Sequence, residues 1–259
     1  MRYAALASGS KGNCHALSDG QNTLLVDAGI SLKQIRARLT ELGWDPGTVR
    51  AVAFTHEHSD HIAALPVLLR NTDWTFLVTR DTLAAIQAIQ GIEIPAERLI
   101  LLRAGHALPW NGARILPFAI PHDAADPVAY RVEWAGWNAA VVTDLGHPTA
   151  LVADHCADLD LLALEANHDV EMLREGDYPP HLKARILSKV GHLSNASMAE
   201  LLARVLGPRL GTVILAHLSE QNNDPALARF SAEEVLKNTR VALHLATQRT
   251  PMQVAPPAE

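Results

Sequence analysis

Residues 55–65 read THEHSDHIAAL and follow directly on an apolar run that is typical of a buried β-strand. Four residues of metal-ligand type lie close together in this segment, namely His56, His58, Asp60 and His61. Imidazole suits zinc, iron and similar metals, and a carboxylate adds a hard oxygen and negative charge. In a loop after a strand, the first two histidines point the same way while Asp60 and His61 turn to a neighbouring position. The spacing therefore favours two metal ions over one, and it favours a metal site over a histidine-rich surface loop.

Further residues of metal-ligand type lie along the chain, each at or just past the end of a predicted strand. They are Asp27, His122, Asp144, Glu165 and His217. In sheet proteins, ligand sites gather at such strand ends. We therefore expect these residues and the histidine-rich segment to converge on one site.

Predicted strands and helices alternate along the chain, with some hairpins. Apolar runs predict strands at 3–7, 23–26, 49–54, 75–78, 99–102, 114–119, 128–134, 138–143, 159–164, 211–216 and 241–246. Helical spacing predicts helices at 31–42, 63–70, 80–90, 197–206 and 226–238. This order predicts an α/β (α+β) fold, a mixed sheet sandwich with helices outside. We expect one domain over residues 1–246 and a frayed tail over 247–259.

Composition narrows the classes of function. The chain has 259 residues, of which 48% are hydrophobic and 19% charged, so it can bury a sizeable core. Its formal net charge is −6, so nucleic acid would have to be attracted by a metal centre or a local basic patch. The sequence has no signal peptide, no apolar stretch of membrane-spanning length and no CxxC zinc motif, and it therefore predicts a cytoplasmic protein. Thirteen histidines point instead to metal or proton chemistry.

The segment HEHSDH resembles the HxHxDH signature of the metallo-β-lactamase superfamily, and the chain follows the superfamily order of motifs. The resemblance implies a four-layer αββα sandwich with two divalent metal ions, Zn²⁺ or Mn²⁺, with Fe also compatible. The implied ligands are His56, His58 and His122 for one ion, and Asp60, His61 and His217 for the other. Asp144 would bridge the two ions, and Asp27 would orient the histidine loop.

Three further motifs are similar to the YycJ/WalJ group, compact relatives of tRNase Z and ribonuclease J. They are SGSKGNC at 8–14, EANHD at 165–169 and GHLSN at 191–195. Asp144 and His217 are only 73 positions apart, too few for the β-CASP insertion of ribonuclease J. The order Glu165, His192, His217 is similar to tRNase Z, in which a glutamate and a histidine assist proton transfer to the leaving group.

The implied chemistry is hydrolysis, with Asp60, Glu165 and His192 as candidate catalytic residues. Two metal ions activate water and clamp the oxygens of a phosphate. A protonated His192 would serve as general acid for the departing alkoxide, and Glu165 would keep that imidazole oriented and charged. The alternative for the segment around His192 is a cap for the following helix, made by Ser194 or Asn195, and both roles can hold together.

Five residues are candidates for substrate binding: Ser10, Asn13, His168, Lys183 and Arg185. Backbone N–H groups in the turn at 8–13 suit a phosphate, although an ordinary hairpin turn explains that segment slightly better on chemistry alone. His168 either lines the pocket or is a plain loop residue. The basic residues of segment 183–189 either meet a polyanion or form a solvated helix face.

The favoured function is a phosphodiesterase or nuclease, exonuclease-like on DNA or RNA, with a phosphodiester substrate and no membrane partner. The alternative within the same fold is a small-molecule hydrolase, for a cyclic phosphodiester such as phosphoribosyl 1,2-cyclic phosphate, a lactone or a thioester. The net negative charge favours this alternative. A non-catalytic regulatory protein is a third possibility, which the presence of every expected ligand residue disfavours. The sequence leaves the oligomeric state open.

Overall fold

Two sheets face each other in residues 1–254, the part of the chain that the computed structural model describes, and each sheet has seven strands. The first sheet consists, in spatial order, of β14 (Met252–Val254), β1 (Arg2–Ala7), β2 (Cys14–Ser18), β3 (Thr23–Val26), β4 (Val49–Ala53), β5 (Thr75–Thr79) and β6 (Leu99–Leu102). The second consists of β13 (Ala242–Leu245), β12 (Thr212–Ala216), β11 (Leu161–Glu165), β10 (Trp137–Val142), β9 (Val128–Trp134), β8 (Ala113–Ala119) and β7 (Leu108–Trp110). Neighbouring strands are parallel from β3 to β6 and from β10 to β13, and antiparallel elsewhere.

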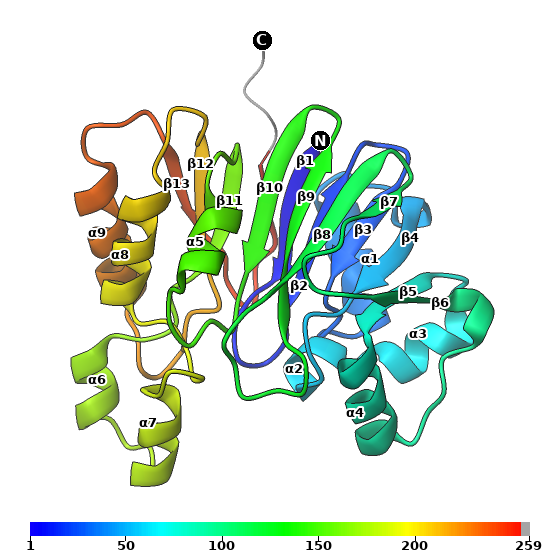
Figure 1. The fold of residues 1–259 in the computed structure, drawn as a ribbon, viewed down its shortest axis with the longest axis horizontal. Coiled ribbons are helices and arrows are strands. Elements are labelled where there is room, and N and C mark those ends of the chain that lie inside the picture. Colours follow the sequence, from blue (N-terminus) through cyan, green and yellow to red (C-terminus); the bar gives the residue numbers. More distant parts are fainter. Residues whose placement is uncertain (255–259) are drawn as a thin grey trace.

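Helices lie on the outer faces of the two sheets and at one end of the sandwich. They are α1 (Leu32–Glu41), α2 (Ser59–Ile62), α3 (Leu65–Asn71), α4 (Arg80–Gln90), α5 (Ala150–Cys156), α6 (Val170–Glu175), α7 (Pro180–Ile186), α8 (Asn195–Val205) and α9 (Pro225–Leu236), with 3₁₀ turns η1 (Pro46–Thr48) and η2 (Ala96–Arg98). In Figure 1, α1, α3 and α4 lie against the first sheet, and α5, α8 and α9 lie against the second. The short helices α2, α6 and α7 lie instead at the lower end of the sandwich in that view.

Three layers of buried apolar side chains hold the sandwich together. In β4, Val52 packs toward the helices, while Ala51 and Ala53 pack between the sheets. In β11, Leu162 and Leu164 pack toward the helices of the other side. Because side chains alternate between the two faces of a strand, each central strand contributes to two layers of core. The predicted αββα sandwich is therefore confirmed.

Some segments differ from the sequence prediction. The glycine-rich turn joins β1 to β2, a strand that the sequence did not predict because its residues, CHALS, include none of the β-branched and aromatic residues that are enriched in strands. The helices α5, α6 and α7 were also missed as defined elements, since helices of six or seven residues are too short to show clear periodicity.

The prediction of a frayed tail is wrong for residues 252–254, which pair with β1 as an edge strand. The rest of that prediction, residues 255–259, lies outside the described residues. Within residues 1–254, no helix has the length and apolar character needed to span a bilayer.

Candidate metal centre

The strand ends of both sheets meet at one end of the sandwich, next to α2, and ligand-type residues follow them. Asp27 follows β3, His56 follows β4, His122 follows β8, Asp144 follows β10, Glu165 ends β11 and His217 follows β12. All of these residues are buried, with at most 6% of each exposed. The fold therefore buries a polar cluster among apolar residues, where each polar atom needs a hydrogen-bond partner or a bound ion.

The first ligand cluster consists of His56, His58 and His122, whose nearest ring nitrogens all lie within 4.8 Å of one another. The Nε2 atom of His122 is 3.2 Å from Nδ1 of His58. The other nitrogen of His122 is 3.1 Å from the carbonyl oxygen of Gly191. That bond uses the Nδ1 proton of His122, so the Nε2 lone pair is left for a metal ion.

The second cluster consists of Asp60, His61 and His217, again within 4.8 Å. The Nδ1 atom of His61 lies 2.7 Å from Oδ2 of Asp27, which also accepts a bond from the Thr55 hydroxyl at 2.9 Å. A buried carboxylate behind the ring fixes the tautomer in which Nε2 faces the cluster, as metal-supporting residues commonly do. Asp27 therefore supports His61 from behind and does not face the cluster itself.

Asp144 lies between the two clusters. Its Oδ2 atom is 3.2 Å from Nε2 of His61, and its Oδ1 atom is 3.8 Å from Nε2 of His122. It also groups within ligand distance with His56 and His61. This is the position that a carboxylate shared by two metal ions would need.

Three buried atoms of this centre lack a hydrogen-bond partner among the described residues: Nε2 of His56, Nε2 of His217 and Oδ2 of Asp144. Leaving a buried polar atom without a partner costs about 1–3 kcal/mol each. A divalent cation bound by nitrogen and carboxylate donors would satisfy all three, so the donor set fits metal ions. The clusters are thus suited to binding metal.

The charges of the centre also fit cations. Burial raises the pKa of Asp144, but the surrounding imidazoles, His217 and His61 foremost, outweigh it and hold that pKa well below its ordinary value. Burial lowers the pKa of His61, but the nearby carboxylates, Asp144 first among them, outweigh it and raise that pKa well above its ordinary value. The carboxylates around His61 therefore favour positive charge at this place.

Glu165 connects the clusters to His192. Its Oε1 atom is 2.9 Å from Nδ1 of His217 and 2.9 Å from Nδ1 of His192. Its Oε2 atom accepts backbone N–H bonds from Leu145 at 2.7 Å and Leu193 at 3.0 Å. Burial raises the pKa of Glu165, but the charges and hydrogen bonds of the two imidazoles outweigh it and lower that pKa to about 2. A fixed anion therefore orients a metal-ligand histidine and a partly exposed histidine at once.

The turn that contains the candidate substrate-binding residues Ser10 and Asn13 uses several of its backbone donors within the protein, as an ordinary hairpin turn does. The N–H groups of Gly9, Lys11 and Gly12 are already bonded within the protein, so they are not free for a phosphate. Asn13 is fully buried, and its Nδ2 atom lies 3.1 Å from Nε2 of His61 and 3.3 Å from Oδ2 of Asp60. Ser10 and Lys11 are exposed at the surface of the turn.

The other predicted substrate-binding residues lie at different distances from the clusters. Arg185 forms an ion pair with Asp123, whose other oxygen is 3.5 Å from Nε2 of His122. Lys183 donates instead to the carbonyl of Arg174 at 2.7 Å. His168 is buried, and its Nδ1 atom has no partner among the described residues. Arg185 thus reaches the edge of the metal centre, and Lys183 is held at the surface beside α6.

Sequence reasoning missed some residues that build the centre. Thr55 bonds both Asp27 and His56, and its position directly before the histidine motif is the one signal that it gives. Asp123 and the supporting role of Asn13 were missed too, because their contacts join segments that are far apart in the chain.

Comparisons with known proteins agree with this geometry. Residues 22–217 match the family model described as Beta-lactamase superfamily domain. Over 232 residues the chain is 37% identical to exodeoxyribonuclease WalJ of Streptococcus pneumoniae, and the matched stretch covers 89% of this chain and 86% of the relative. Over 237 residues it is 35% identical to exodeoxyribonuclease YycJ of Bacillus anthracis, covering 92% and 89%. The crystal structure of the metallo-β-lactamase fold protein YhfI from Bacillus subtilis is similar in fold, with a TM-score of 0.73, 17% identity, and 98% and 99% of the two chains covered.

Proposed function

Because the chain belongs to the β-lactamase superfamily, we propose that it is a metal-dependent phosphodiesterase that removes nucleotides from the ends of DNA. Two similar relatives, both named exodeoxyribonucleases, support DNA as the substrate. Two divalent ions, Zn²⁺ or Mn²⁺ with Fe also compatible, would be held by the seven ligand residues His56, His58, Asp60, His61, His122, Asp144 and His217.

The observation that carries this proposal is the hydrogen bonding of Glu165. It accepts from His217, which lies among the metal ligands, and from His192, whose side chain is 20% exposed. Glu165 holds the ring of His192 through Nδ1, so that Nε2 is the ring atom left to face a substrate. The site thus pairs a proton donor with a metal cluster, as hydrolysis of a diester with an alkoxide leaving group requires.

The residues of the chain would divide the work as follows. The chemistry that bound divalent ions supply is charge for the phosphate oxygens and a lowered pKa for the attacking water. Asp60 and Asp144 hold negative charge between the imidazoles. His192 gives the departing oxygen its proton through Nε2, and Glu165 compensates the charge of the ring. The buried donors His56 and His61 stay oriented by Thr55 and Asp27.

A substrate panel tests the proposal on metal-loaded wild type. We expect release of mononucleotides from linear DNA, with less activity on RNA, and loss of the activity when a chelator removes the metal. The panel also includes bis-p-nitrophenyl phosphate, circular DNA, a cyclic ribose phosphate and a lactone.

The alternative is a small-molecule hydrolase, which the net charge of −6 favours because it repels polyanions. Hydrolysis of the lactone or the cyclic phosphate that exceeds hydrolysis of DNA would establish this alternative. Equal activity on circular and linear DNA would contradict an enzyme that works from ends.

A further inference from the structure

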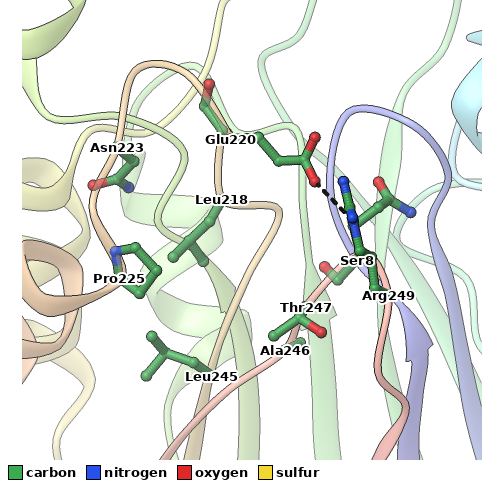
Figure 2. A pocket seen from close by; sticks show the side chains of 11 residues that line it. Ser8, Leu218, Glu220, Asn223, Pro225, Leu245, Ala246, Thr247 and Arg249 are labelled. Atoms are coloured by element: carbon green, nitrogen blue, oxygen red, sulfur yellow. Dashed lines mark ion pairs between the residues drawn. The ribbon is translucent and has the colours of Figure 1, made fainter.

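A pocket of about 740 Å³ lies beside the metal centre, where the chain leaves β12. Figure 2 shows Leu218, Pro225 and Leu245 on one side of it and the Glu220–Arg249 ion pair on the other. Ser8 lines the pocket, and its hydroxyl accepts the backbone N–H of His217 at 2.7 Å. The pocket is therefore one residue away from a metal ligand, yet no group of the metal centre uses it.

The glycine-rich turn connects this pocket to the metal centre. Ser8 stands in the pocket at one end of the turn, and Asn13 contacts Asp60 and His61 at the other. Five residue steps span at most about 18 Å when fully extended. The turn is bent by the bond from the Gly12 N–H to the Gly9 carbonyl, so the separation is shorter. A polymer engaged at the metal centre would reach the pocket within a few monomers.

Positive charge and an aromatic ring lie at and beside the pocket. Lys11 and Arg249 both pair with Glu220, so the three exposed groups together carry one positive charge. The side chains of Lys11 and Arg249 are 67% and 83% exposed, although the overall charge of the chain is negative. A hollow of about 70 Å³ adjoins the pocket and shares Glu220 with it, and Lys11 and Tyr178 line this hollow together.

We propose that the pocket and the hollow form one track for single-stranded DNA, and this inference rests on the proposed function. One base enters the pocket against Leu218 and Leu245, a neighbouring phosphate contacts the exposed ends of Lys11 and Arg249 on the side away from Glu220, and the next base stacks on Tyr178. Apolar and aromatic surfaces accept the face of any base, and a basic groove follows the backbone. The occupant is a DNA strand because the exposed ammonium and guanidinium groups complement phosphate charge.

The track does not read base sequence. The amide of Gln248 already bonds the Lys11 N–H and the Gly12 carbonyl, and the Thr247 hydroxyl already bonds Thr250. These polar groups therefore hold the glycine-rich turn and the segment 247–250 in place, and few of them are left to bond the edges of bases. We expect binding that tolerates any sequence and weakens with salt.

Binding of a fluorescent single strand with phosphorothioate linkages, which resist hydrolysis, tests the track on the metal-loaded protein. Tyr178→Ala should weaken binding about 5-fold or more, and Tyr178→Phe should restore it. Lys11→Ala should reduce the slope of log affinity against log salt by about 0.7. Glu220→Gln should tighten binding, because it frees two cations, and Thr247→Trp should weaken it by filling the pocket.

Matched controls come from the far end of α9. Lys237 and Glu234 form an ion pair with side chains 61% and 57% exposed, much like Lys11 and Glu220 at 67% and 41%. Lys237→Ala and Glu234→Gln should leave both binding and hydrolysis as in wild type. A Lys11→Ala effect no larger than that of Lys237→Ala would overturn the track.

The two proposals fail in different ways. If wild type degrades DNA while all track variants bind the strand as wild type does, the track is wrong and the proposed function stands. If metal-loaded wild type hydrolyses no phosphodiester, the proposed function is wrong whatever the binding series gives. Concentration-dependent self-association that Thr247→Trp abolishes would place a second copy of the chain in the pocket and overturn the track.

Discussion

Asp27, Asp144 and His217 adopt backbone angles that L-residues usually avoid, with φ of 63°, 59° and 55°. Each stands one or two residues past a strand, and the left-handed turn there redirects the chain where the side chain contributes to the metal centre or, for Asp27, supports it from behind. Such a conformation costs on the order of 1–3 kcal/mol per residue. No sequence pattern signals it, because aspartate and histidine are not the residues that mark left-handed turns most strongly. The sequence therefore predicts which residues come together at the metal centre, but not the left-handed backbone conformation that three of them adopt there.

At the same scale, support from behind the ligands sets metal affinity. Asp27→Asn keeps the shape of the side chain but removes the anion 2.7 Å from Nδ1 of His61. We expect metal affinity to fall about 10- to 100-fold while the site survives. Competition with a chromogenic chelator measures this, with Asp45→Asn, a cap of the exposed turn η1, as control. Unchanged affinity and activity would mean that Asp27 merely ends a strand.

His192 separates a diester hydrolase from other hydrolases. His192→Ala should keep the metal content but lose about 10²- to 10⁴-fold in activity on DNA, whose alkoxide leaving group needs a proton. The loss on p-nitrophenyl diesters should be much smaller, because that leaving group departs without one. His181→Ala, an exposed histidine of α7, serves as control. Equal losses on both substrates would contradict a general acid at this position.

At the scale of elements, the long periodic segments were predictable and the short ones were not. The helices α1, α4, α8 and α9 each run ten residues or more and show an apolar face that the sequence reveals. The helix predicted at 63–70 corresponds to α3, which has Pro66 in its first turn, whereas the short helix α2 directly before it was not predicted. Short elements such as α6 depend on one cap, Asp169, and on contacts from elsewhere in the fold.

The placement of α2 depends on a glycine. A Cβ at Gly29 would lie 1.6 Å from the Asp60 carbonyl oxygen, so the chain before α1 approaches the ligand loop as closely as backbone allows. Gly29→Ala should push that loop away, destabilise the fold by about 1–3 kcal/mol and reduce metal binding. Urea unfolding and elemental analysis measure the two effects. Gly207→Ala is the matched control, since its Cβ would meet nothing nearer than 3.9 Å.

At the scale of the whole molecule, the metal centre joins the two sheets. His56, His58, Asp60 and His61 come from the end of the first sheet, whereas His122, Asp144 and His217 come from the second. Elsewhere the sheets are held by apolar contacts between their inner faces. Without metal, buried carboxylates and imidazoles at this end are left with atoms that have no partner among the described residues.

Metal ions bound by residues of both sheets should therefore stabilise the folded state, and their removal should lower its free energy of unfolding. Ligands that bind the folded state alone stabilise it by RT ln(1 + [L]/Kd), about 2.7 kcal/mol at a hundredfold excess over Kd. For a domain of this size, that corresponds to a rise in Tm of roughly 5–10 °C.

We expect a chelator to lower the Tm of wild type by this amount and to leave the Tm of Asp144→Ala nearly unchanged. Because Asp144 lies between both clusters, His58→Ala should retain part of the shift. Calorimetry with and without chelator measures all three, and an equal shift in wild type and Asp144→Ala would mean that the stabilising metal binds elsewhere.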